Sequence, residues 1–98
     1  MIDFRFSAPL WRWKGDGAWH FVTVPDDISV ALKALSPDAK RGFGSVRVRV
    51  KTGQTEWKTS VFPDKSSGCY LLPVKKEVRK VENLTVDRSA EYELELAL

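Results

Sequence analysis

Apolar and polar residues alternate over most of the chain, which is the pattern of strands that bury one face. The clearest stretch covers residues 43–51, where valines at 46, 48 and 50 alternate with basic residues. The same period of two predicts strands over residues 2–8, 18–24, 43–51, 56–62, 69–74 and 91–98. Loops are expected between them, including a hairpin turn at residues 14–17 and a loop at residues 63–68.

The first strand changes phase near Pro9. Ile2, Phe4, Phe6 and Ala8 share one parity, whereas Trp11 and Trp13 take the other. A β-bulge near Pro9 would account for this change.

Two short segments have helical spacing. After Pro25, either Asp26 or Asp27 is expected to cap a helix with its side chain. Ile28, Leu32 and Leu35 would form its buried face. A second helix is expected over residues 75–82, with Val78 and Val81 inward and Asn83 as a left-handed C-cap.

The two halves of the chain resemble each other, approximately over residues 1–51 and 55–98. Residues 4–8 resemble 57–61, residues 21–25 resemble 69–73, and residues 46–50 resemble 92–96. We infer a duplicated β-β-α-β unit within one domain, residues 1–98. The predicted fold is mostly β: a small closed barrel of about six strands with two short helices, because closure removes exposed strand edges. Such a barrel is expected to be a monomer.

Composition narrows the class of protein. The chain has 98 residues, 43% of them hydrophobic, and a single cysteine, Cys69. It can therefore form no intramolecular disulfide and no zinc site with several thiolates. Neither a long apolar span nor a signal peptide is visible, so we expect a cytoplasmic protein without a membrane segment.

The net charge of +3 is small, but its distribution is uneven. Basic residues gather at Lys40, Arg41, Arg47, Arg49 and Lys51, and acidic residues at Glu91, Glu93 and Glu95. One interpretation is that these charges pair across neighbouring strands on the outer face. The alternative is a basic docking patch for a polyanion.

Six segments form an ordered set along the chain, at residues 4–8, 19–25, 43–48, 59–63, 68–74 and 78–80. Together they resemble the bacterial family called domain of unknown function 1905. This resemblance implies a double-split β-barrel similar to those of AbrB- and MazE-type proteins, formed here by one duplicated chain. Those sequences usually carry Gly-Asp before the last strand, where this chain has Val86 and Asp87. A positive φ at Val86 would be strained, so the turn at residues 86–89 is expected to differ.

No catalytic signature is visible. His20 is the single histidine, and neither Ser60 nor Cys69 lies in a known nucleophile motif. No metal-ligand spacing and no cofactor motif occur, so we expect a protein that is not an enzyme. The alternative is an enzyme with an unusual site around Ser60, Asp64 and Lys65 in the loop at residues 59–68.

The leading hypothesis is a binding or accessory module for a protein or a small ligand. Its surface would be a groove at the barrel mouth lined by Trp11, Trp13, Trp57 and Tyr70, although most of the four tryptophans are expected in the core. The alternative is a nucleic-acid-binding regulator of AbrB-like type. Its basic patch would consist of Arg47, Arg49, Lys75, Lys76 and Arg79.

Overall fold

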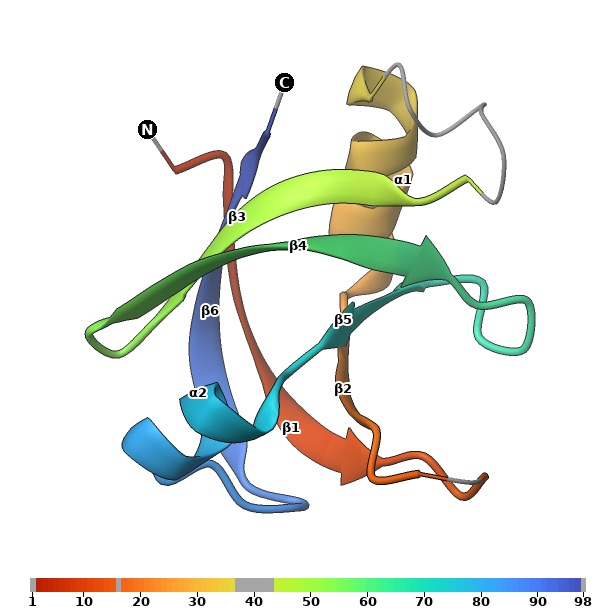
Figure 1. The fold of residues 1–98 in the computed structure, drawn as a ribbon. Helices are drawn as coiled ribbons and strands as arrows, with labels where there is room; N and C mark the ends of the chain where they lie inside the picture. Colours follow the sequence, from red (N-terminus) through yellow and green to blue (C-terminus); the bar gives the residue numbers. More distant parts are fainter. Residues whose placement is uncertain (1, 16, 37–43, 98) are drawn as a thin grey trace.

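Six antiparallel strands form a closed barrel in the computed structural model, which describes residues 2–15, 17–36 and 44–97. The elements in chain order are β1 (Phe4–Arg12), β2 (His20–Thr23), α1 (Asp26–Leu35), β3 (Val46–Thr52), β4 (Thr55–Pro63), β5 (Tyr70–Pro73), α2 (Lys76–Val81) and β6 (Ser89–Leu96). Around the barrel the order is β1-β2-β5-β4-β3-β6. Figure 1 shows α1 and α2 near opposite ends of the barrel. The predicted fold class is confirmed.

The alternating pattern directs side chains as expected. In β3, Val46, Val48 and Val50 are buried while the basic residues between them are exposed. Phe43, where this strand was expected to begin, lies outside the described residues. None of the described helices has the length and apolar character needed to cross a membrane.

The bulge expected near Pro9 is wrong. β1 pairs with β6 in unbroken register from Phe4↔Leu94 to Pro9↔Ser89, and then with β2 from Leu10↔Val22. Pro9 therefore lies where β1 changes neighbours, a position at which its missing N–H interrupts no continuous ladder. Trp11 has the other parity because it lies on the outer face of the same strand.

Helix α1 begins differently from the prediction. Its N-cap is Pro25, and no side chain caps it; the Asp27 carboxylate accepts instead from the adjacent N–H of Ile28 at 2.9 Å. Leu32 is fully buried and Ile28 packs against the core, but Leu35 is 61% exposed, contrary to the prediction.

Helix α2 has six residues and buries only Val78; Val81, expected inward, is 68% exposed. Asn83 has a φ of 53° and follows the C-cap, as predicted. The N–H of Leu84 donates to the carbonyl of Arg79 at 2.8 Å, which together with Asn83 forms a Schellman motif.

The turn before β6 takes its positive φ at Asp87 (70°), not at Val86. Asp tolerates the left-handed region better than a β-branched residue does, so the missing glycine causes no strain at Val86. The turn is fixed to β1, because the N–H of Asp87 donates to the carbonyl of Leu10 at 2.8 Å.

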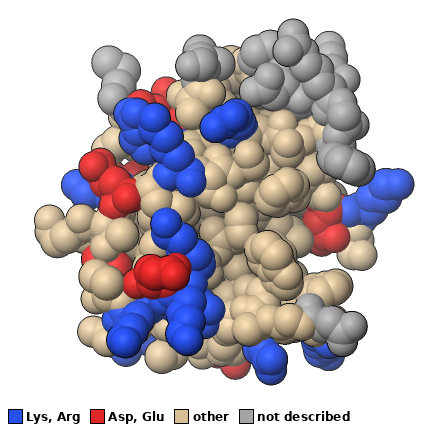
Figure 2. All heavy atoms as spheres, viewed as in Figure 1, with Lys and Arg blue, Asp and Glu red and all other residues tan. Residues whose placement is uncertain are grey.

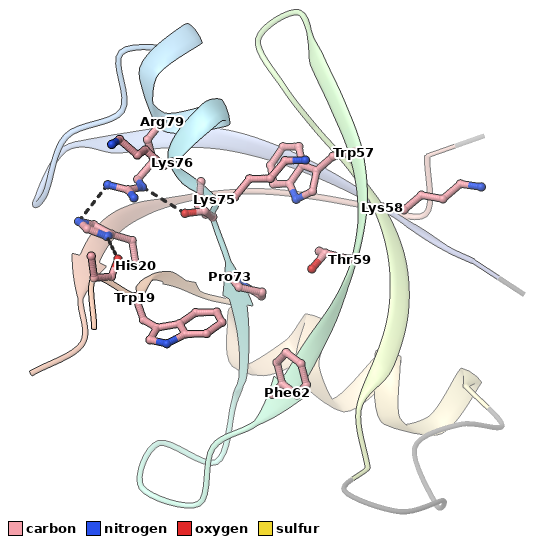
Figure 3. Close-up of a pocket in the computed structure, with 12 residues that line it drawn as sticks. Trp19, His20, Trp57, Lys58, Thr59, Phe62, Pro73, Lys75, Lys76 and Arg79 are labelled. Atoms are coloured by element: carbon pink, nitrogen blue, oxygen red, sulfur yellow. Dashed lines mark hydrogen bonds between the residues drawn. The ribbon is translucent and has the colours of Figure 1, made fainter. Parts of the chain in front are cut away.

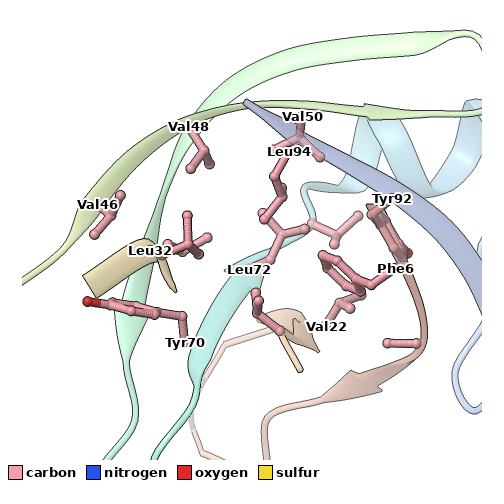
Figure 4. Close-up of a cluster of buried hydrophobic side chains, with 14 of the residues drawn as sticks. Phe6, Val22, Leu32, Val46, Val48, Val50, Tyr70, Leu72, Tyr92 and Leu94 are labelled. Carbon is pink, nitrogen blue, oxygen red and sulfur yellow. The ribbon is translucent and has the colours of Figure 1, made fainter. Parts of the chain in front are cut away.

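The core is a single cluster of large apolar side chains from all six strands and both helices (Figure 4). Tyr92 stacks on Phe6 with 5.8 Å between ring centroids. The Tyr92 hydroxyl is buried and has no hydrogen-bond partner among the described residues. Burial raises the pKa of Tyr92 to about 12.

The strand order is unchanged when β1, β2 and β3 are exchanged with β4, β5 and β6. Hydrogen bonds follow the same exchange: Val24 N donates to Tyr70 O at 2.9 Å, and Val74 N donates to His20 O at 3.0 Å. A residue in β2 or at the start of α1 therefore corresponds to the residue about 50 positions later in the second half. Pro25 corresponds to Lys75, whereas the sequence comparison matches it to Pro73. The topology has internal two-fold symmetry; gene duplication stays a prediction.

Candidate functional site: a pocket between β4 and β5

Strands β4 and β5 pair over only two residue pairs, Phe62↔Leu71 and Pro63↔Tyr70. The earlier part of β4 pairs with β3 on one side and has no strand neighbour on the other, because β5 ends at Pro73 and the chain turns into α2. A cavity of about 510 Å³ opens there (Figure 3). We call it the β4–β5 pocket; its lining is residues 18–20, 57–59, 62, 73–76 and 79.

Aromatic rings form two sides of this pocket. Trp19 and Phe62 are 56% and 44% exposed, and Trp19 stacks on Phe21 at a centroid distance of 6.2 Å. Trp57 is only 8% exposed, and its indole nitrogen faces the pocket in Figure 3. No acceptor for this N–H occurs among the described residues, so within this part of the chain the indole N–H is available to a ligand in the pocket.

Arg79 and His20 meet at the α2 end of the pocket. The Nδ1 of His20 lies 2.7 Å from the carbonyl oxygen of Ala18. Because a carbonyl can only accept, Nδ1 carries the hydrogen and Nε2 is left as an acceptor in the neutral ring. Arg79 donates from Nη1 to this Nε2 at 3.3 Å and from Nε to the carbonyl of Val74 at 3.2 Å.

The lining is positively charged. Lys58, Lys75, Lys76 and Arg79 contribute to it, and no Asp or Glu does. Within residues 2–15, 17–36 and 44–97 none of these four cations forms an ion pair with a carboxylate. Figure 3 shows Lys58 extending away from the pocket and Lys75 extending toward the Trp57 indole. Unpaired positive charge beside aromatic rings suits an anion that also has an apolar part.

The sequence profile of the family described as domain of unknown function (DUF1905) matches residues 6–94. The chain belongs to this family. A comparison of this DUF1905 domain with curated proteins gives no match.

Of the four aromatic residues predicted to line a groove, this DUF1905 domain places only Trp57 in the pocket. Trp11 lies on the outer face, where it contacts Phe21 and donates from Nε1 to Thr23 Oγ1 at 3.0 Å. Trp13 is 45% exposed on the β1–β2 hairpin, and Tyr70 is buried in the core. The expectation that most tryptophans are core residues is wrong, since Trp57 alone is buried.

The predicted basic patch is divided by the fold. Lys75, Lys76 and Arg79 line the pocket, whereas Arg47 and Arg49 lie on the outer face of β3. Arg49 pairs across the strands with Glu95 at 3.1 Å, which confirms the cross-strand interpretation at this position. Lys40 and Arg41 lie outside the described residues.

The acidic residue of the loop considered as an enzyme site, Asp64, has a structural role. The Asp64 carboxylate accepts from the hydroxyl of Ser67 at 2.8 Å and from its N–H at 3.3 Å. Cys69 Sγ lies 3.8 Å from Asp26 Oδ1. Among the described residues no group of three or more His, Cys, Asp or Glu is arranged to hold a metal ion.

The rings of Trp19, His20 and Phe62 were not assigned to a binding surface from the sequence, although all of them line the pocket. Trp19 and His20 stand next to each other after a hairpin, which was a usable signal. Phe62 was not identifiable, because its role depends on where β4 and β5 stop pairing.

Proposed function

We propose that this DUF1905 domain is a non-enzymatic binding module that holds a small ligand in the β4–β5 pocket. The observation that carries the proposal is a cavity of about 510 Å³ with aromatic sides and with hydrogen-bond donors that have no acceptor among the described residues. Small-molecule sites typically measure about 300–1,000 Å³ and combine apolar walls with a few polar groups.

Binding rather than catalysis fits the polar groups that face this cavity. Both ring nitrogens of His20 are engaged, by the carbonyl of Ala18 and by Arg79. A general base needs a free acceptor within reach of its substrate. The remaining polar side chains of the lining are cations and Thr59, which recognise a ligand more readily than they transform it.

The test is a fragment screen by saturation-transfer NMR on the whole chain, with Trp19→Ala and Trp13→Ala as a matched pair. Both tryptophans are roughly half exposed, but only Trp19 lines the pocket. Fragments should bind the wild type and the Trp13 variant, and lose binding to the Trp19 variant. Absence of hits, or hits that are insensitive to Trp19, would contradict the proposal.

A nucleic-acid-binding regulator related to the bacterial AbrB- and MazE-type barrels is the second candidate. Figure 2 supports it by showing Lys and Arg side chains from the β3–β4 face down to α2, interrupted by acidic ones. Fluorescence anisotropy with labelled duplex DNA tests it. This function requires affinity that survives physiological salt and is lost when Arg47 and Arg49 become Glu.

We also propose that the domain acts as a cytoplasmic monomer with an internal duplication. One chain supplies all six strands of the closed barrel, so no strand is needed from a partner. Sedimentation equilibrium should give the mass of a single chain; a dimer at micromolar concentration would contradict this.

A further inference from the structure

Hydrogen bonds fix the orientation of the Arg79 guanidinium, but neither acceptor is a carboxylate that would neutralise its charge. Its two hydrogen-bond acceptors, the carbonyl of Val74 and Nε2 of His20, are both uncharged. Its remaining N–H donors have no acceptor within the described part of the chain. A half-buried arginine fixed in this way presents charge and a planar set of donors to a neighbouring anion.

The β4–β5 pocket is also polarised along its length. Figure 3 shows Arg79 beside His20 at the α2 end, Lys75 reaching across to Trp57 on the β4 side, and Trp19, Pro73 and Phe62 farther from α2. A ligand that fills both ends therefore needs an anionic group on one side and a flat apolar body on the other. Aromatic rings prefer to stack against rings such as those of Trp19 and Phe62.

We propose that the ligand of the β4–β5 pocket is a planar aromatic anion, a ring system that bears a carboxylate or a phosphate. Arg79 binds the anionic group, Lys75 adds positive charge to the pocket, and the ring packs against Trp19 and Phe62. His20 is a positioning residue that orients Arg79. This inference rests on the proposed function and narrows its ligand to one chemical class.

Other ligand classes fit the same geometry less well. A neutral aromatic compound would cover the Arg79 guanidinium without supplying a strong acceptor, which leaves desolvated N–H donors. An aromatic cation would meet like charges at Arg79 and Lys75. A non-planar anion would satisfy Arg79 but would stack poorly on the rings.

Isothermal titration calorimetry with four matched probes tests the class: 2-naphthoate, 2-naphthamide, 2-naphthylmethylammonium and cyclohexanecarboxylate. The proposal expects 2-naphthoate to bind at least about tenfold more tightly than each of the others, because one charge-assisted hydrogen bond is worth about that factor. Adding 2-naphthyl phosphate distinguishes whether a phosphate or a carboxylate is preferred.

Two variants on α2 locate the anion contact. Arg79→Gln should weaken 2-naphthoate binding about 10- to 100-fold while leaving the weaker binding of 2-naphthamide nearly unchanged. Lys80→Gln removes the same charge from the same helix, but Lys80 is exposed and outside the pocket, so it should change affinity less than about twofold. Circular dichroism checks that both variants are folded.

The possible outcomes distinguish the proposed small-ligand function from the narrower proposal that the ligand is an aromatic anion. Equal or tighter binding of the amide or the ammonium probe, sensitive to Trp19→Ala, would overturn the anion inference while the small-ligand function stands. Equal losses in Arg79→Gln and Lys80→Gln would show a general charge effect and would also overturn it. If no probe and no library fragment binds in a Trp19-dependent way, both proposals fail.

Discussion

Ser29 and Arg79 occupy corresponding places in the two halves of the barrel, yet they do different things. Each is the fourth residue of its helix, and each side chain donates to the carbonyl five residues earlier, Val24 for Ser29 and Val74 for Arg79. Each also meets the opposite strand: Ser29 Oγ accepts from Tyr70 N at 3.0 Å, and Arg79 donates to His20.

The short neutral side chain closes its half of the barrel. Ser29 is 3% exposed, and Tyr70, which corresponds to His20, is buried beside it. Burial raises the pKa of the Tyr70 hydroxyl, as expected for a phenol withdrawn from water. The long cationic side chain in the other half leaves an opening beside it. The same backbone arrangement thus holds a buried contact in the first half and borders the β4–β5 pocket in the second.

The largest expected effect concerns the helix that closes the first half. Leu32→Ala removes a fully buried side chain of α1 and should lower the unfolding free energy by about 2–5 kcal/mol. Val78→Ala in α2 removes fewer carbon atoms and should cost less. Urea unfolding measures both; an equal or larger loss for Val78→Ala would contradict the view that α1 closes the barrel more tightly.

High pH should destabilise the second half through Tyr92. The pKa of Tyr92 in the folded protein, about 12, lies above the ordinary value of 10.0, so the neutral phenol makes its full contribution to the unfolding free energy below pH 10. This contribution is lost as pH rises through about 12, and the total loss of unfolding free energy is roughly 3 kcal/mol. Tyr92→Phe removes the unpartnered hydroxyl and should be at least as stable as wild type at pH 7.

The control for this pH effect is the difference between wild type and Tyr92→Phe, since lysines titrate in both proteins. Unfolding free energies should diverge above pH 10, with the wild type losing more stability. Parallel curves up to pH 12 would mean that the hydroxyl is not buried as described.

Ser29→Ala should lower the unfolding free energy by about 1–3 kcal/mol, because the buried N–H of Tyr70 loses its acceptor. Ser7→Ala, on the exposed face of β1, is the control and should stay within about 0.5 kcal/mol of wild type. Neither change should alter 2-naphthoate affinity. If Ser29→Ala were as stable as the wild type, the comparison between the two halves would be contradicted.

Arg79→Gln should have the smallest effect on stability, about 0.5 kcal/mol or less, because its side chain is partly solvated. Thermal denaturation measures this alongside the loss of anion binding. A destabilisation as large as that of Ser29→Ala would show that Arg79 serves the fold in the way that Ser29 does.

The sequence was sufficient for the barrel because its strands alternate so clearly, as in β3. It was insufficient for the detailed match between the halves, since a pattern with a period of two looks the same after a shift of two residues. Pro25 was therefore matched to Pro73, whereas the hydrogen bonds match it to Lys75.

The pocket was harder to predict than the fold. Trp57 and three of the basic residues were identified from their type, but the opening between β4 and β5 depends on where pairing stops. Leu35 and Val81 were wrongly placed inward because helical spacing does not show how far each helix extends beyond the core.

The most direct test of the pocket follows the four tryptophan indole N–H signals in a ¹H–¹⁵N NMR titration with 2-naphthoate. The account predicts that the Trp57 and Trp19 signals shift with one common affinity, while those of Trp11, bonded to Thr23, and Trp13 stay in place. Shifts confined to Trp11 and Trp13, or no indole shift at saturating probe, would contradict it.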